Sequence, residues 1–178
     1  SGAVTGLRTD LPTYRFEGVR ARFHGVESTA KLRMVGGRSA LLSADSTRGA
    51  VDLELRADVV HATDLTHNQA MPRIAPMRLG ADALWSRDAW GARIGWIHTA
   101  AQNRVPEGGV ATGSHTLWNA GLNYRAHVGS THWMWFARFD NITNKLAYSS
   151  TSVLTQTLRD AAPPIAGRSV KVGAQVSF

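Results

Sequence analysis

Several histidines and carboxylates in this sequence are of the types that bind metal ions. They lie in or beside segments without a regular strand pattern, and they are His61, His67 and His115, with Asp64, Glu107 and Asp160. Imidazole and carboxylate groups together suit zinc or haem iron. No fixed spacing such as His-x3-His connects them, so the alternative for each is a solvated loop residue. If the protein handles a metal, we expect His61, His67 and His115 to contact it.

No arrangement typical of a catalytic centre occurs in the sequence. There is no Gly-x-Ser-x-Gly motif and no paired acid and base. The glycines of "VGG" and "EGG" stand outside a strand-to-helix context and do not predict a phosphate-binding loop. We therefore predict no catalytic residues, no intrinsic cofactor and a protein that is not an enzyme.

The composition limits the class of protein. The chain has 178 residues, of which 43% are hydrophobic, and its formal net charge is +7. Lys and Arg are scattered rather than clustered, so nucleic acid is not an expected partner. No apolar run approaches the 18 residues of a membrane helix, but membrane β-strands, which are half polar, are not excluded. Cysteine is absent, which excludes a disulfide framework and a thiolate metal site.

Alternation of apolar and polar residues is the dominant pattern along the chain. "VDLELRADVV" places Val51, Leu53, Leu55, Ala57 and Val59 on one face and four charged residues on the other. The same alternation recurs in "MRLGADALW", "WGARIGWI", "LWNAGLNYRAHV", "THWMWFARFD" and "SVKVGAQVSF". It predicts seven strands, at 14–35, 49–62, 77–86, 89–101, 116–128, 131–143 and 168–178. In the first of these the pattern slips after Gly25, which predicts a β-bulge there.

The connections alternate in length. Short turns are expected at "SRDA" and "HVGS", and long loops at 63–76, 102–115 and 144–167, with "TSVLTQTLRDAA" interpreted as loop. The stretch 36–48 is an intermediate case. Short turns on one rim and long loops on the other are typical of an outer-membrane β-barrel. The sequence starts with "SGAVTGLRTD", without an initiator Met or a signal peptide, so we expect a mature or excised piece of a longer protein.

Two features favour a membrane barrel over a soluble sandwich or lipocalin-like barrel. Tryptophans lie on the apolar face near strand ends, as in an aromatic girdle: Trp85, Trp90, Trp118, Trp133 and Trp135. The opposite face carries full charges in mid-strand. We expect these groups to face the lumen: Arg20, Arg22, His24, Asp52, Glu54, Arg56 and Asp58. Their expected contact is water at the inner wall.

Four segments resemble the C-terminal part of TonB-dependent outer-membrane receptors. "FDNITN", with Asn141 and Asn144, is similar to the family's aromatic-Asx-Asn run, and "PPIAGR" followed by a strand ending in Phe178 is similar to its terminus. "RARFHGVES" resembles the aromatic-x-Gly-x-Glu strand, and "MPRIAP" resembles the Leu-Pro-Arg-Ile-Pro-Pro segment. Ala75 and Ala166 stand where the family has proline.

The resemblance implies the C-terminal third of a 22-stranded transmembrane antiparallel barrel, with residues 1–178 all belonging to the barrel. It implies a Gram-negative outer membrane, energy-coupled uptake, and zinc, haem or an iron-siderophore as substrate, the zinc and haem receptors being most similar. The implied partners are the rest of the barrel, a plug domain, the TonB complex, outer-membrane lipid and the barrel-assembly machinery. Phe178 would be the assembly signal. The alternatives are a structural or translocator barrel that anchors a surface domain, and a soluble β-barrel binder.

Overall fold

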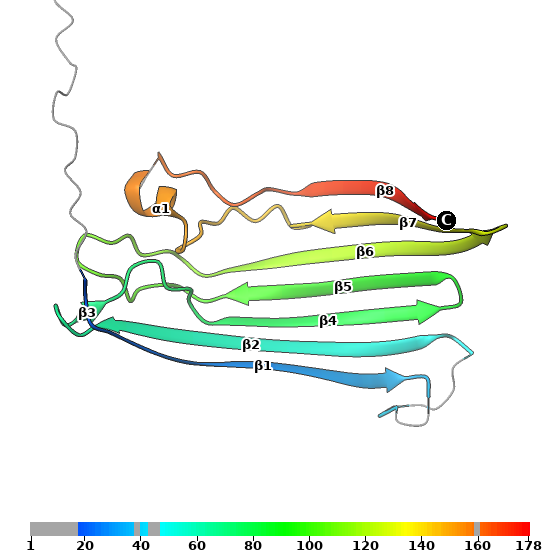
Figure 1. Ribbon diagram of the computed structural model, residues 1–178, viewed down its shortest axis with the longest axis horizontal. Coiled ribbons are helices and arrows are strands. Elements are labelled where there is room, and N and C mark those ends of the chain that lie inside the picture. Colours follow the sequence, from blue (N-terminus) through cyan, green and yellow to red (C-terminus); the bar gives the residue numbers. More distant parts are fainter. Residues whose placement is uncertain (1–17, 38–39, 43–46, 159–160) are drawn as a thin grey trace, which may run out of the picture.

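The computed structural model describes residues 18–37, 40–42, 47–158 and 161–178. Eight strands of this part form one antiparallel sheet, and one short helix lies in a loop (Figure 1). The elements are β1 (Ala21–Val35), β2 (Ala50–Asp64), β3 (Gln69–Ala70), β4 (Arg78–Arg87), β5 (Trp90–Thr99), β6 (His115–Val128), β7 (Thr131–Asp140), α1 (Val153–Leu158) and β8 (Ser169–Ser177). None of the described helices is long and apolar enough to cross a membrane.

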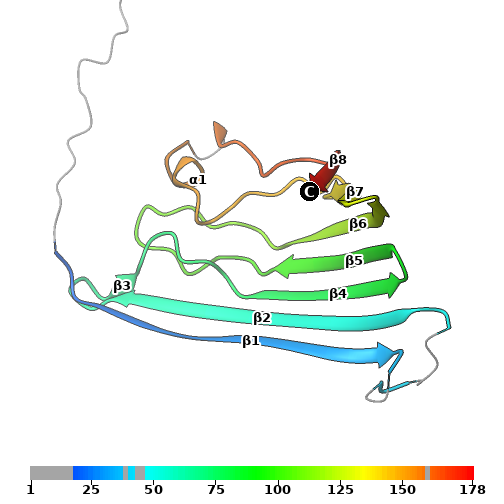
Figure 2. The same cartoon turned by 45° about the vertical axis from the view of Figure 1, so that its right-hand side comes forward.

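The sheet is a meander in which each long strand pairs with the next one in the chain. The order is β1-β2-β4-β5-β6-β7-β8, and the two-residue strand β3 pairs with β2 beside this path. Figure 2 shows the strands as one curved layer. Within the described residues, β1 and β8 each have a single neighbour, so both outer edges of the sheet carry unpaired backbone groups.

Because of the strand register, the apolar residues of neighbouring strands lie on one side of the sheet and most charged residues lie on the other. One rung across seven strands is apolar throughout: Leu32, Leu53, Ala83, Ile94, Ala120, Phe139 and Val170. The adjacent rung points to the other side: Arg33, Asp52, Leu84, Arg93, Gly121, Arg138 and Lys171. We call these two sides the apolar face and the charged face. The predicted separation of Leu53, Leu55, Trp118, Leu122, Trp135, Val172 and Val176 from Asp52, Glu54, Arg56, Asn119 and Lys171 is confirmed.

No second layer covers the apolar face of the described sheet. The buried hydrophobic residues of the described part are three alanines, Ala62, Ala147 and Ala162. Ile94 and Val172, in contrast, expose 53% and 77% of their surface. A soluble sandwich of this length buries one face of each sheet against another. The described residues therefore form a single-layer wall and not a sandwich.

The two ends of the strands differ in the length of their connections. Turns of two residues, 88–89 and 129–130, join β4 to β5 and β6 to β7 at one end, which also holds Phe178 (Figure 1). At the other end lie the loops 65–77, 100–114 and 141–168. We call these ends the short-turn rim and the loop rim. The predicted contrast between short turns and long loops holds for these five connections, whereas the connection from β1 to β2, residues 36–49, is long although it lies at the short-turn rim.

Aromatic side chains form two bands on the apolar face. Near the short-turn rim, the rings of Trp90, Tyr124, Trp135 and Trp133 follow one another, with centroids 4.6, 5.8 and 5.5 Å apart. Nearer the loop rim, Trp96 pairs with Trp118. Trp96 lies six positions after Trp90 in β5, which corresponds to roughly 20 Å along the strand. Two bands at this spacing match the girdles that flank an apolar belt.

The predicted β-bulge at Gly25 is wrong. β1 and β2 pair without a break from Ala21 to Arg33, and the one irregularity lies between Arg33 and Val35. The apolar residues change face while the backbone keeps its register, so Phe23 lies opposite Ala62 on the charged face. A bulky residue at position 25 would collide with the Val59 carbonyl of β2, so Gly25 permits close pairing there instead of a slip.

Three smaller predictions also differ from the structure. The segment interpreted as loop contains α1, which is too short to show a helical period in the sequence. The strand β3 was not predicted, because two residues carry no alternation. The first strand begins at Ala21 instead of residue 14; residues 18–20 are not in a strand, and 14–17 lie outside the described residues.

Candidate functional site

Ion pairs run along the charged face from strand to strand. Arg33 and Lys31 of β1 contact Asp52, and Lys31 also lies 3.4 Å from Glu54. Farther toward the loop rim, Arg78 Nε donates to Asp58 Oδ1 over 2.9 Å. Because most of these side chains are partly exposed, single pairs add at most about 1 kcal/mol each. We call these ion pairs the ionic ladder. The ladder contributes little to strand pairing, and its main effect is to make the charged face hydrophilic.

Asp82 is the exception, because its carboxylate is buried. The residue is 2% exposed, and its two oxygens accept hydrogen bonds from Arg93 Nε, at 2.7 Å, and from Arg56. Gly95 lies directly opposite on β5, and a Cβ there would overlap the carboxylate. Glycine at position 95 thus makes the room in which one carboxylate can serve two guanidinium groups.

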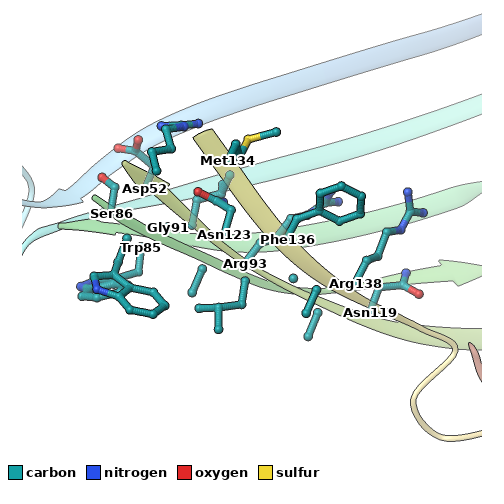
Figure 3. A pocket seen from close by; sticks show the side chains of 18 of the residues that line it. Asp52, Trp85, Ser86, Gly91, Arg93, Asn119, Asn123, Met134, Phe136 and Arg138 are labelled. Carbon is teal, nitrogen blue, oxygen red and sulfur yellow. The ribbon is translucent and has the colours of Figure 1, made fainter. Parts of the chain in front are cut away.

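A shallow hollow lies over the centre of the charged face, between β4 and β7. Figure 3 shows Ser86, Asn123, Met134 and Phe136 on one side of the strands and Trp85 on the other. The Asn123 side-chain oxygen is buried without a hydrogen-bond partner. Phe136 lies over Gly173 of β8. This part of the face therefore offers apolar contact beside the ionic ladder.

At the loop rim, loop side chains form hydrogen bonds with other loops and with the end of β2. Arg104 donates to the Ala62 carbonyl over 2.7 Å and to Thr63 Oγ1 over 2.6 Å. Gln102 donates to the Ile74 carbonyl over 2.8 Å. Gln156 of α1 both accepts from the Val110 amide and donates to the Val110 carbonyl, over 2.9 and 3.1 Å. These bonds join the three long loops into one layer.

The "FDNITN" motif has a structural role at the base of the 141–168 loop. Asn141 is 3% exposed, with φ 48°, a conformation that asparagine tolerates better than most residues. Its side chain accepts from the Lys145 amide and donates to the Lys145 and Ala166 carbonyls. Asn144 accepts from the Arg168 amide over 3.0 Å. The two asparagines thus close the loop where it leaves β7 and where it returns to β8, and we call Asn141 and Asn144 the latch.

A second hollow lies where the charged face meets the loop rim. It is lined by Arg78, Arg138, Lys171, His115 and Tyr148, with Ala75 and Pro76 of the "MPRIAP" segment at its edge. Asp140, the one carboxylate in the lining, accepts from Arg138 over 2.8 Å and from Lys171 over 3.4 Å. The Nδ1 atom of His115 is buried without a partner. Arg78 is already paired with Asp58, but Arg138 and Lys171 share the single carboxylate of Asp140, and this excess of positive charge favours a ligand with anionic groups. We call this hollow the rim pocket.

The three histidines predicted to contact a metal lie in three different places and do not come together. His115 lines the rim pocket. His61 is paired with His24 on the apolar face, and their ring centroids are 5.4 Å apart. His67 lies in the turn after β2, where its Nδ1 is 2.7 Å from Asp64. Of the three, the structure places only His115 in a hollow on the charged face.

Asp64 shapes the turn that contains His67. Its Oδ1 accepts hydrogen bonds from the amides of Thr66 and His67, over 2.8 and 3.2 Å. Asp64 stands at the loop end of β2, six residues beyond the last pair with β4, and the hydrogen bond from His67 holds the pKa of its carboxyl below the usual value. Both predicted loop residues therefore stabilise the turn.

Of the other two predicted carboxylates, the structure describes Glu107 and not Asp160. The Glu107 amide donates to Gln69 at the loop rim, and Asp160 lies outside the described residues. Among the described histidines, aspartates and glutamates, no three converge in a way that could hold a metal ion. Phe178 stands fully exposed at the short-turn rim.

The expected lumen set divides between the faces. Asp52, Glu54, Arg56 and Asp58 share the charged face. Arg22 and His24 pair with Thr63 and His61 on the apolar face, because the bulge that would have moved them is absent. Arg20 lies before β1, and its backbone is bonded to Leu65 and Thr66.

Sequence reasoning missed Asp82, Arg93 and the latch formed by Asn141. The available signals were Gly95, placed by the alternation on the side of the charges, and the two asparagines of "FDNITN". Neither signal gives the cross-strand register that brings Asp82 between Arg56 and Arg93.

No protein-family model matches the sequence. The fold is similar to the solved structure of a protein named "Copper transporter OprC", with a TM-score of 0.68 and 17% sequence identity. The similarity covers 89% of this chain and 23% of that chain, so this chain spans about a quarter of that protein's length. Together with the two faces and the two open edges, the match identifies the fold as a segment of an antiparallel β-barrel.

Proposed function

We propose that this chain is the C-terminal part of the barrel of a TonB-dependent outer-membrane receptor that imports a metal ion or metal complex. The observation that carries the proposal is the single-layer sheet with one apolar and one charged face. In this reading the apolar face meets lipid and the charged face meets the lumen. A Lys or Arg on the lipid side at mid-height costs about 2–4 kcal/mol, which accounts for the confinement of the ion-pair ladder to the other face.

The two open edges support a larger barrel as the complete structure. Unpaired strand edges do not persist in a bilayer, so β1 and β8 require further strands to close the wall. The proposed partners are the remaining strands of the receptor, a plug domain inside them, and the TonB complex that supplies energy through the plug. The motifs that resemble the receptor family, "FDNITN" and "PPIAGR", meet in the latch of Asn141 and Asn144.

The rim pocket is the proposed first contact for substrate. Its cations Arg138 and Lys171, which share one carboxylate, favour a metal complex that carries carboxylate or similar anionic groups, and His115 adds an imidazole to the lining. The similar protein is by its name a copper transporter, which supports a metal-containing substrate without selecting zinc, haem or a siderophore. We therefore keep the substrate class as a metal ion or an anionic metal complex.

A transport assay tests the proposal. The natural full-length protein would be deleted and restored in its own host under metal limitation, and cell-associated zinc, copper and iron would be measured. We expect the deletion to lower at least one metal and a proton-gradient uncoupler to have the same effect. Restored cells carrying Arg138→Ala and Lys171→Ala should accumulate less metal with the receptor still folded. Unchanged metal content after deletion would support the anchoring or translocator barrel instead.

Phe178 is the proposed signal for barrel assembly, since it directly follows the last strand, β8, at the short-turn rim. Deleting it from the full-length protein should lower the amount of folded protein in the outer membrane several-fold. The measurement is heat-modifiable mobility in membrane fractions. A Phe178→Tyr variant is the control, because it keeps the ring, and an unchanged folded amount after deletion would reject the role.

A further inference from the structure

Two histidines face each other across the β6–β7 hairpin at the short-turn rim. His127 pairs with His132, and their ring centroids are 4.3 Å apart with the planes at 76°. Both side chains are exposed. The register puts them on the charged face, two residues along each strand from Arg125 and Met134. Two imidazoles thus stand within the reach of one ion, at the end of the sheet opposite to the rim pocket.

The neighbours of this pair add soft and neutral donors. A small hollow is lined by both histidines together with Met134, Gln175, Ser177 and Arg125. Ser177 of β8 lies opposite His132, and Gln175 lies opposite Met134. The lining contains no carboxylate, so it does not suit calcium or magnesium, which prefer several charged oxygen ligands. The thioether and the two imidazoles are donors that copper accepts.

The turn fixes the backbone positions from which the two imidazoles project. Gly129 takes φ 61° in the two-residue turn, and the Thr131 hydroxyl donates to the Val128 carbonyl over 2.7 Å. Trp133 Nε1 donates in turn to the Thr131 hydroxyl over 2.9 Å. Because the turn already places the two histidines opposite each other, binding one ion between them requires no rearrangement of the backbone.

We propose that His127, His132 and Met134 form a copper-binding site at the short-turn rim. The imidazoles bind Cu(II), and Met134 adds a soft ligand that favours Cu(I). The Arg125 guanidinium opposes any cation, but it is exposed and solvent screens it, so a metal that binds imidazole strongly is selected over weakly bound ions. The site is separate from the rim pocket and does not depend on the proposed transport function.

The test is a copper titration of the natural full-length protein, purified in detergent. Electron paramagnetic resonance of one added equivalent of Cu(II) should show coupling to two imidazole nitrogens. The variant carrying His127→Ala and His132→Ala should lose this signal and bind Cu(II) at least about 100-fold more weakly, because a linked pair of ligands is lost. The variant with Met134→Leu should weaken Cu(I) binding in competition with a chromogenic chelator and leave the Cu(II) signal in place.

The matched control is the other cross-strand histidine pair, His24 and His61. Its rings are stacked at 15° on the apolar face, and replacing both with alanine removes the same number of imidazoles. We expect that variant to keep the copper signal. Loss of the signal there with retention in the His127→Ala, His132→Ala variant would overturn the proposal, as would a wild-type spectrum without imidazole coupling. Unchanged Cu(I) affinity in Met134→Leu would remove Met134 from the site. Because binding is measured in detergent, none of these results depends on whether the protein transports metal.

Discussion

Ile94 and Val172, in the middle of the sheet, expose 53% and 77% of their surface, whereas Gln102 and Asn141, at the loop rim, expose 9% and 3%. The usual distribution of a folded chain is thus reversed, with apolar groups outside and polar groups inside. At the rim, each buried amide has hydrogen-bond partners within the same chain. In the sheet, no second layer of the described residues packs against the apolar side chains. The difference teaches that the rim is completed by its own loops, while the sheet needs surroundings that the described residues do not supply.

The largest expected effect comes from placing a charge on the apolar face. Val172→Arg puts a guanidinium where lipid is proposed, at a cost of about 2–4 kcal/mol near mid-height. Gln175→Arg is the matched control, because Gln175 is also exposed on β8 but lies on the charged face. The measurement is the unfolding free energy of the full-length protein in lipid vesicles. Equal costs for the two variants would break the contrast between the faces.

A smaller effect is expected at the rim, from the latch. Asn141→Ala removes three side-chain hydrogen bonds and leaves alanine at a positive φ, for a local cost of about 1–3 kcal/mol. Limited proteolysis should then cut the 141–168 loop faster, while the barrel keeps its heat-modifiable mobility. The exposed neighbour variant Leu146→Ala controls for cleavage specificity. Unfolding of the whole barrel by Asn141→Ala would show that rim and sheet are not separate units.

The smallest effect concerns the turn of Asp64 and His67. Since the pKa of the Asp64 carboxyl is lowered in the folded protein, its contribution is complete above the usual carboxyl pKa and is lost as the pH falls through the lower folded value. Hydrogen-exchange protection of the Thr66 and His67 amides should therefore persist at mildly acidic pH and decline only below the usual carboxyl range. Asp64→Asn should lower this protection a few-fold at neutral pH and flatten its pH dependence. Protection lost already near pH 6 would assign the turn to another group.

The sheet could be predicted from the sequence because its pattern is local. In β5, Trp90, Ala92, Ile94 and Trp96 alternate with small or charged residues, and the face follows directly from the period of two. The same reasoning failed at Gly25, since a change in which face is apolar looks like a slip of the backbone. The pairing of His24 with His61, within an unbroken register, shows that the apolar face changes and that the backbone does not slip.

The candidate site was less predictable, because it depends on contacts between distant segments. His115, His61 and His67 looked equivalent as loop histidines, but His61 belongs to the apolar face and His67 to a local turn. The rim pocket arises where residues near 78, 115, 138 and 171 meet, and no sequence spacing encodes that meeting. The receptor-like motif pointed to Asn141, but not to its task of closing a loop.

The meander also bears on how such a wall can change during evolution. Each long strand is bonded only to the strands before and after it in the chain, and two of the connections are turns of two residues. Duplicating or deleting one hairpin would therefore preserve the sidedness of every other strand and return the chain to the same rim. The hairpin is thus the natural unit of gain and loss, and barrels of different circumference can descend from one another without redesign of the strands that remain.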